Sequence, residues 1–167
     1  MRLLAAAAAF CLSAAAGVRG AQLFSLRART LDLLVLLLER LTTELRFSCA
    51  PLPDMLFRLS AQPPFDALVL LSVCCENLRA GVSLPAAFDA GVSASGRTLR
   101  PWEQTRLRQL GSLLGATDLS GQQQVLAETI AFLEDCHSKA VQQQDSAGKL
   151  CRACGLCCGT VLFILIL

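Results

Sequence analysis

The chain of 167 residues is long enough for one domain, and its composition is typical of a helical protein. Hydrophobic residues make up 54% of it, the mean hydropathy is +0.53 and tyrosine is absent, so leucine and alanine supply the apolar surface. Both residues favour helices, and β-branched residues are sparse before the last few positions, which argues against a large sheet. A net charge of +2 is too small to indicate a nucleic-acid surface, so we expect no nucleic-acid partner.

The nine cysteines cannot all pair within one chain, because their number is odd. Cys74 and Cys75 are adjacent in one apolar run, and a second apolar run holds Cys154, Cys157 and Cys158. This placement is typical of cysteine used as a small hydrophobic residue. It favours a reducing compartment.

An uncharged apolar run, residues 3–18, lies between Arg2 and Arg19 near the start of the chain. At about 1.5 Å per residue the run falls short of the roughly 30 Å hydrocarbon core of a bilayer, although uncharged neighbours extend it. The run also fits a cleaved signal peptide, since a basic residue precedes it and small residues occupy 14–16. The run alone does not separate a retained anchor from a signal whose cleavage would export the rest of the chain.

A second apolar run, residues 153–167, ends the chain. We predict a transmembrane anchor over 1–19, a cytoplasmic helical bundle over 20–150 and a transmembrane helix over 151–167. Basic residues flank both runs on their inner sides, and the positive-inside rule then places the central region in the cytoplasm and favours the retained anchor. The basic residues expected to face the lipid headgroups are Arg19, Arg27, Arg29, Lys149 and Arg152.

Gly155 and Gly159 give the second run a G-x-x-x-G spacing, which lets another helix backbone approach closely. The first run is rich in alanine and offers a smooth partner surface. We hypothesise that the two membrane spans pack on each other; the competing explanation is a chance match, since glycine is common in membrane helices.

Between the two runs, apolar residues recur at helical spacing and are interrupted by proline and glycine. Asp118 is placed to cap the last helix, and Ser83 to cap an earlier one. The polar stretch after Ser138 is interpreted as a helical stalk rather than a flexible linker. The predicted helices cover 26–47, 53–59, 65–79, 84–92, 101–114 and 119–150.

Leucines spaced three and four apart give the first of these helices an apolar stripe: Leu31, Leu34, Leu38, Leu41 and Leu45. Glu44 follows Arg40 by one turn, a spacing that predicts an ion pair between them. About six helices of this kind bury their stripes most readily as an antiparallel bundle, so the predicted fold class is all-α.

Two motifs carry a family resemblance. One is Thr43-Glu44-Leu45-Arg46-Phe47 followed by Ala50-Pro51-Leu52-Pro53, and the other is Leu110-Gly111, Leu114-Gly115, Asp118 and Gln122. In their order and spacing they resemble the stage III sporulation protein AB family over nearly the whole chain. Phe88, Phe47 and Leu45 stand where that family usually has Trp, Tyr and Ile, and these exchanges largely conserve volume.

The resemblance implies a helical bundle similar to the repeated domains of the type II secretion inner-membrane platform protein. It implies a scaffold in the mother-cell membrane facing the forespore, where a secretion-like channel assembles. The implied partners are the cytoplasmic secretion-type ATPase of the same set, the AA protein, and the other stage III sporulation channel proteins. The residues expected to contact a partner are Glu44, Asp118 and Gln122, with a helix cap as the competing explanation for Asp118.

The sequence contains few patterns typical of catalytic, nucleotide-binding or metal-binding sites. Cys151, Cys154 and Cys157 have ferredoxin-like spacing, but Cys158 is adjacent instead of spaced and an apolar run follows, which favours apolar filler over a metal or iron–sulfur site. His137 is the sole histidine, and neither a Walker A loop nor a G-x-G-x-x-G motif is present. We expect no enzyme activity, no cofactor, no metal and no small-molecule substrate. The alternative function is a secreted helical binding protein with a cleaved signal peptide.

Overall fold

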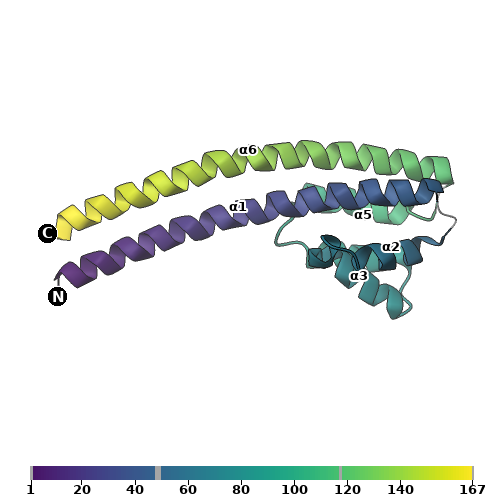
Figure 1. The fold of residues 1–167 in the computed structure, drawn as a ribbon, viewed down its shortest axis with the longest axis horizontal. Helices are drawn as coiled ribbons and strands as arrows, with labels where there is room; N and C mark the ends of the chain where they lie inside the picture. Colours follow the sequence, from purple (N-terminus) through teal and green to yellow (C-terminus); the bar gives the residue numbers. More distant parts are fainter. Residues whose placement is uncertain (1, 48–49, 117, 167) are drawn as a thin grey trace. The chain divides into compact units, whose positions relative to one another are not determined.

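The structure, a computed structural model, describes the backbone of residues 2–47, 50–116 and 118–166, and the side chains of residues 25–47, 50–116 and 118–144. The described backbone contains helices and no strand. The all-α prediction is therefore confirmed, and the number of helices agrees with a bundle of about six. In chain order they are α1 (Arg2–Phe47), α2 (Leu52–Ser60), the short 3₁₀ helix η1 (Phe65–Ala67), α3 (Val69–Arg79), α4 (Leu84–Ala94), α5 (Pro101–Leu113) and α6 (Leu119–Ile166) (Figure 1).

The chain divides into two compact units. The terminal unit combines Met1–Ala28 with Ser138–Leu167, and the bundle unit is Arg29–His137. In the terminal unit, Nη1 of Arg27 donates a hydrogen bond to Oε1 of Gln143 at 3.2 Å, which joins α1 to α6. Residues 139–150 belong to α6, so this stretch is helical, as the stalk interpretation expects.

Within the part of the chain that the structure describes in full, no helix is long and apolar enough to cross a membrane. The predicted spans, residues 1–19 and 151–167, lie outside that part. The side chains predicted to face lipid or to pack the spans also lie outside it at Arg19, Lys149, Arg152, Gly155 and Gly159.

The leucine stripe of α1 lies at the centre of the bundle unit. Its five members are at most 6% exposed, as their three-and-four spacing predicts: Leu31, Leu34, Leu38, Leu41 and Leu45. Leu126 and Leu133 of α6 are fully buried, and so is Thr129, whose hydroxyl donates to the carbonyl oxygen of Val125 at 2.8 Å. That hydrogen bond satisfies the buried hydroxyl, so the core can hold a threonine without cost from an unpaired donor.

Proline and glycine set the limits of the short helices. Pro51 holds an extended conformation before α2, and Pro53 lies in its first turn, where an N–H group would have no helical partner. Gly81 and Gly115 follow α3 and α5, each with φ of +82°, a left-handed conformation that costs glycine little.

The predicted helix over 65–79 is wrong in one detail, because the chain breaks at Leu68. This residue is extended and 2% exposed, and it lies between η1 and α3. Its side chain is buried in the core through this break, which the helical spacing of its neighbours did not reveal.

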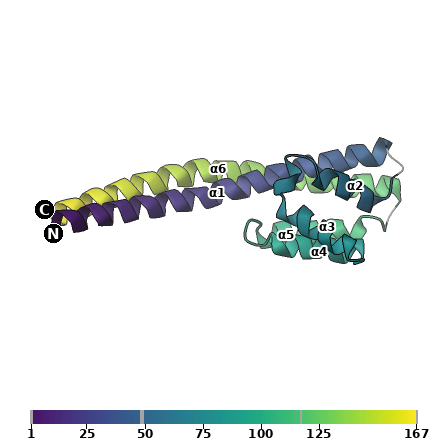
Figure 2. The same ribbon diagram turned by 60° about the horizontal axis from the view of Figure 1, so that its bottom comes forward.

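Two glycines let the short helices lie close together, with α3 against α4 and α4 against α5 (Figure 2). A Cβ atom at Gly91 would overlap the backbone carbonyl oxygen of Leu70 on α3. A Cβ atom at Gly111 would lie 2.6 Å from Cδ1 of Phe88 on α4. Since protein interiors are close-packed, the spacing of these helices requires glycine at both positions.

Among the described residues of the bundle unit, Cys74, Cys75 and Cys136 are buried, and none of the three forms a disulfide. Burial, reinforced by the neighbouring Cys75, raises the pKa of the Cys74 thiol to about 12. This thiol therefore stays protonated near neutral pH and is a poor nucleophile. The placement agrees with cysteine used as a small hydrophobic residue.

Replacing Gly111 with alanine should destabilise the bundle unit by about 1–3 kcal/mol, because the new methyl group would overlap the ring of Phe88, itself only 3% exposed. Urea unfolding followed by circular dichroism measures this loss. The exposed neighbour Ser112 provides the control, since Ser112→Ala should change stability by less than about 0.5 kcal/mol.

The double variant Gly111→Ala/Phe88→Leu tests the cause of that loss. If the overlap is responsible, the two substitutions will be non-additive and the double variant will recover part of the lost stability relative to the sum of the single changes. Strict additivity would contradict the steric explanation.

Candidate interaction site

Residues from both family motifs meet in an apolar groove on the bundle unit. The groove encloses about 410 Å³, where the first turns of α2 and α4 lie near the end of α5. We call it the proline groove, and its lining residues are Leu52, Pro53, Leu84, Pro85, Leu114, Gly115 and Ala116. Leu52 and Pro53 belong to the first motif, and Leu114 and Gly115 to the second.

The local sequence explains the character of this groove. Pro53 and Pro85 lie in the first turns of α2 and α4, and neither helix has a side-chain hydrogen bond at its N-cap. Ser83 occupies the N-cap position of α4 but does not cap it, contrary to our prediction. The groove wall therefore consists of hydrocarbon and helix ends, and none of its described lining residues is charged.

Asp118 lies just beyond Ala116 and caps α6, as predicted. Its Oδ1 accepts the N–H of Gly121 at 3.2 Å, and its Oδ2 accepts the hydroxyl of Ser120. The Ser120 hydrogen bond first, and then that of Gly121, lower the pKa of this exposed carboxyl. The N–H of Gln122 donates to the carbonyl oxygen of Asp118 at 2.9 Å, so these two predicted contact residues lie together.

Glu44 lies away from the proline groove. Its Oε2 accepts Nη2 of Arg58 at 2.8 Å, which joins α1 to α2. The structure thus gives Glu44 a partner on another helix instead of Arg40, because α2 folds back along α1 after the break at Pro51 (Figure 1). The two side chains are 34% and 53% exposed, so this pair contributes little to stability. A partner contact through Glu44, Asp118 or Gln122 stays a prediction.

Two basic side chains of the predicted lipid-facing set are described. Arg27 bonds to Gln143, and Arg29 is exposed. Neither position identifies a ligand by itself, so the headgroup contact stays a prediction as well.

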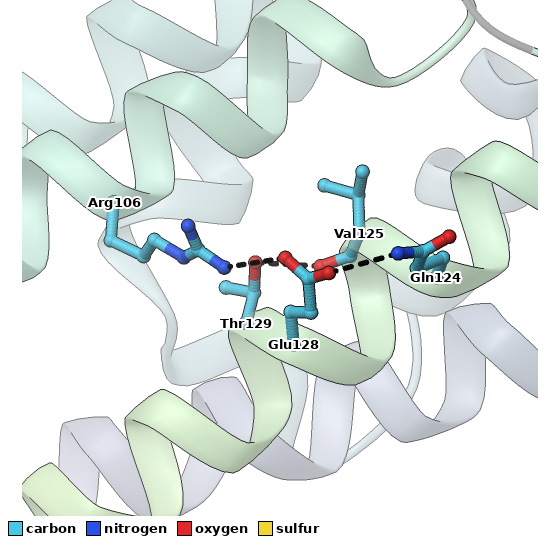
Figure 3. A network of polar contacts seen from close by, with 5 residues as sticks. All are labelled: Arg106, Gln124, Val125, Glu128 and Thr129. Atoms are coloured by element: carbon cyan, nitrogen blue, oxygen red, sulfur yellow. Dashed lines mark hydrogen bonds and ion pairs between the residues drawn. The ribbon is translucent and has the colours of Figure 1, made fainter.

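A polar network that the sequence analysis missed joins α5 to α6 (Figure 3). The carboxylate of Glu128 accepts Nη2 of Arg106 at 3.2 Å and Nε2 of Gln124 at 3.2 Å. The spacing of Gln124 and Glu128 is a local signal that a sequence can provide. Arg106 lies 22 residues from Glu128, and no local pattern relates them.

The groups needed for reactive chemistry do not gather in the described part of the chain. No three His, Cys, Asp or Glu side chains there could hold a metal ion. The cluster from Cys151 to Cys158 lies outside the described side chains. The proline groove offers apolar contact surface, with neither an acid, a base nor a nucleophile in its lining.

The fold and the groove define a class of protein, the all-α bundle proteins with an apolar groove at their helix ends. A family model described as stage III sporulation protein AB matches residues 2–167, and the chain therefore belongs to the stage III sporulation protein AB family. The resemblance carried by the two motifs is thus confirmed. No curated protein and no solved structure matches the chain.

Asp118→Ala should lower the melting temperature at neutral pH, because α6 loses its cap. The folded-state pKa of Asp118 is lowered from 3.8, so its contribution is complete above that value and is lost as the pH falls through the folded-state pKa. The difference in melting temperature between the unaltered chain and the variant should therefore shrink on acidification. Asp118→Asn keeps a hydrogen-bond acceptor and should show a smaller loss of melting temperature without this pH dependence. If the difference in melting temperature between the unaltered chain and Asp118→Ala does not change with pH, the carboxylate is not the cap.

A double-mutant cycle with Arg106→Ala and Glu128→Ala should give a coupling free energy of about 0.5 kcal/mol, since the side chains are 31% and 54% exposed. Raising the salt concentration should reduce it. Urea unfolding of the four proteins provides the measurement. Arg106→Ala combined with Asp54→Ala on α2 is the control pair, and equal coupling in both cycles would refute a specific ion pair.

Proposed function

We propose that the chain is a non-enzymatic membrane scaffold of the channel between mother cell and forespore, and that it docks a cytoplasmic secretion-type ATPase to the membrane. Membership of the stage III sporulation protein AB family supports the setting. The observation that carries the docking role is the proline groove, in which residues of both family motifs form one apolar surface.

The groove has the features of a docking site for an apolar side chain. Leu114 forms its buried wall, Leu52 and Leu84 are half-buried, and Pro85 is exposed at its rim. Burying one apolar side chain there is worth about 1.5–3 kcal/mol, enough to make it a dominant contact of the interface. Asp118, which is exposed and follows the lining residue Ala116 by two positions in the chain, offers a negative charge to a basic residue of the ATPase and favours one orientation of the partner.

Attachment to the mother-cell membrane is the second part of the proposal. The apolar runs at residues 3–18 and 153–167 support it, together with the basic residues on their inner sides. Each of these residues contributes about 1 kcal/mol near an anionic surface. The helical region between the two apolar runs, residues 20–150, then faces the cytoplasm, where the ATPase is present.

The competing function is a secreted helical binding protein, which the signal-like start of the chain supports. The thiols of Cys74, Cys75 and Cys136 argue against it, because buried cysteines outside disulfides suit a reducing compartment better than an exported protein. Mass spectrometry of the mature N-terminus separates the two, since only the exported protein loses the first apolar run.

The test of docking is co-purification of the full chain, in detergent, with the AA-type ATPase of the same organism. Leu84→Glu should weaken binding at least about tenfold, because it places a charge in the groove. Leu84 is the first residue of α4, where glutamate suits the helix dipole and the fold is retained. Asp118→Lys and Glu44→Lys, tested alongside, show whether either carboxylate contributes.

Val69→Glu is the matched control for the groove variant. Val69 is 53% exposed and begins α3, so the substitution adds the same charge to a first helical turn outside the groove. Its binding should equal that of the unaltered chain. Equal weakening by both variants, or no saturable binding by the unaltered chain to a folded ATPase, would refute docking through the groove.

A further inference from the structure

A second groove on the bundle unit runs between α1 and α6. It encloses about 570 Å³ and shares no residue with the proline groove. We call it the α1–α6 groove. Its lining residues are Glu39, Thr42, Thr43, Arg46 and Phe47 on α1, and Ala127, Ile130, Ala131 and Glu134 on α6.

The charges of this groove are separated towards its two ends. Within the bundle unit α1 and α6 run antiparallel, so late residues of α1 lie level with early residues of α6 (Figure 1). Glu39 and Glu134 therefore mark one end, and Arg46 marks the other. Glu39 and Arg46 are seven positions apart on α1, which is about 10 Å along the axis.

The surface between these ends is apolar. The hydroxyls of Thr42 and Thr43 donate to carbonyl oxygens of their own helix, at 2.7 Å and 3.0 Å, which leaves their methyl groups for contact. Ala127 and Ala131 are exposed and one turn apart, so they form a hollow on α6. Phe47 is 86% exposed, which is unusual for so large an apolar side chain.

From this pattern we propose that the α1–α6 groove binds the same groove of a second copy of the chain, in an antiparallel two-fold pair. A two-fold axis through the middle of the groove places Arg46 of each copy beside Glu39 and Glu134 of the other. The same operation brings Phe47 of each copy to the acidic end of its partner's groove, where Ala131 is the nearer of the two alanines. The pattern is self-complementary, as a two-fold interface requires, whereas a parallel pairing would set like charges against each other.

The size of the groove indicates the strength of the pairing. A stable interface buries roughly 1,200–2,000 Å² in total, which is more than one groove between two helices supplies, so the pair is weak in dilute solution. Confinement to a membrane surface raises the effective concentration and favours it. That last point rests on the proposed membrane attachment, but the pairing itself is independent of ATPase docking.

Photo-crosslinking of the full chain in phosphatidylglycerol-containing vesicles tests the proposal. Benzoylphenylalanine replaces Phe47 with little change in shape, and two isotopically distinct preparations are mixed before reconstitution. We expect a species of twice the mass in which position 47 of one copy is joined to α6 of the other, near Ala131. Mass spectrometry identifies crosslinks between copies because they contain both isotopes.

Charge exchange then tests the pairing geometry. Arg46→Glu should reduce the crosslink between copies about fivefold, because an ion pair is lost at each end of the interface. Adding Glu39→Arg and Glu134→Arg should restore it by reversing every pair. Arg40→Glu is the control, since Arg40 is exposed on α1 but does not line the groove, and its yield should be unchanged.

Circular dichroism confirms that each variant keeps its helix content. With helix content retained, an Arg46→Glu yield equal to that of the unaltered chain would overturn the proposal, as would a triple variant that fails to recover. Crosslinks between copies that map only outside α6 would overturn it as well.

Discussion

Burial of the leucine stripe of α1 is the interaction on which the bundle unit depends. The five leucines of this stripe, the first of them Leu31 and the last Leu45, are almost completely removed from water, and each such burial is worth about 1.5–3 kcal/mol. One neighbouring helix cannot cover a stripe of this width, so the short helices are needed to close the core. Gly91 and Gly111 let those helices pack closely enough to do so, since each occupies a point where a side chain would clash. The small residues are therefore as much a part of the core as the leucines.

The sequence predicted most reliably what local patterns encode. The stripe of α1 follows from helical spacing, and the cap at Asp118 follows from its place before a helix. The errors lie where tertiary contacts override a local preference. Leu68 breaks a regular pattern to enter the core, and Ser83 has the right residue type for a cap without making the bond. Glu44 bonds to Arg58 across helices although a nearer arginine was available.

The candidate site, too, was predictable from the sequence only where local patterns determine it. The second family motif could be recognised in the sequence, and the structure explains several of its members as architecture. Gly111 permits a close contact, Gly115 takes a left-handed conformation, and Asp118 caps α6. The groove that these residues help to form was not predictable, because Leu84 and Pro85 join it from another helix. Bringing the start of α4 beside the end of α5 is a property of the folded chain alone.

The turn between α5 and α6 also sets the rotational phase of the last helix. Because α6 is continuous from Leu119 to the end of the bundle unit at His137, the angular position of each residue in that stretch is fixed where the helix begins. Inserting or deleting one residue in the turn would rotate the side chains of that stretch by about 100° about the helix axis. Leu126 and Leu133 would then leave the core, and Ala127 would leave the α1–α6 groove. A single substitution therefore changes this stretch of helix at one position, whereas a change in the length of the turn before it affects every face of the stretch at once.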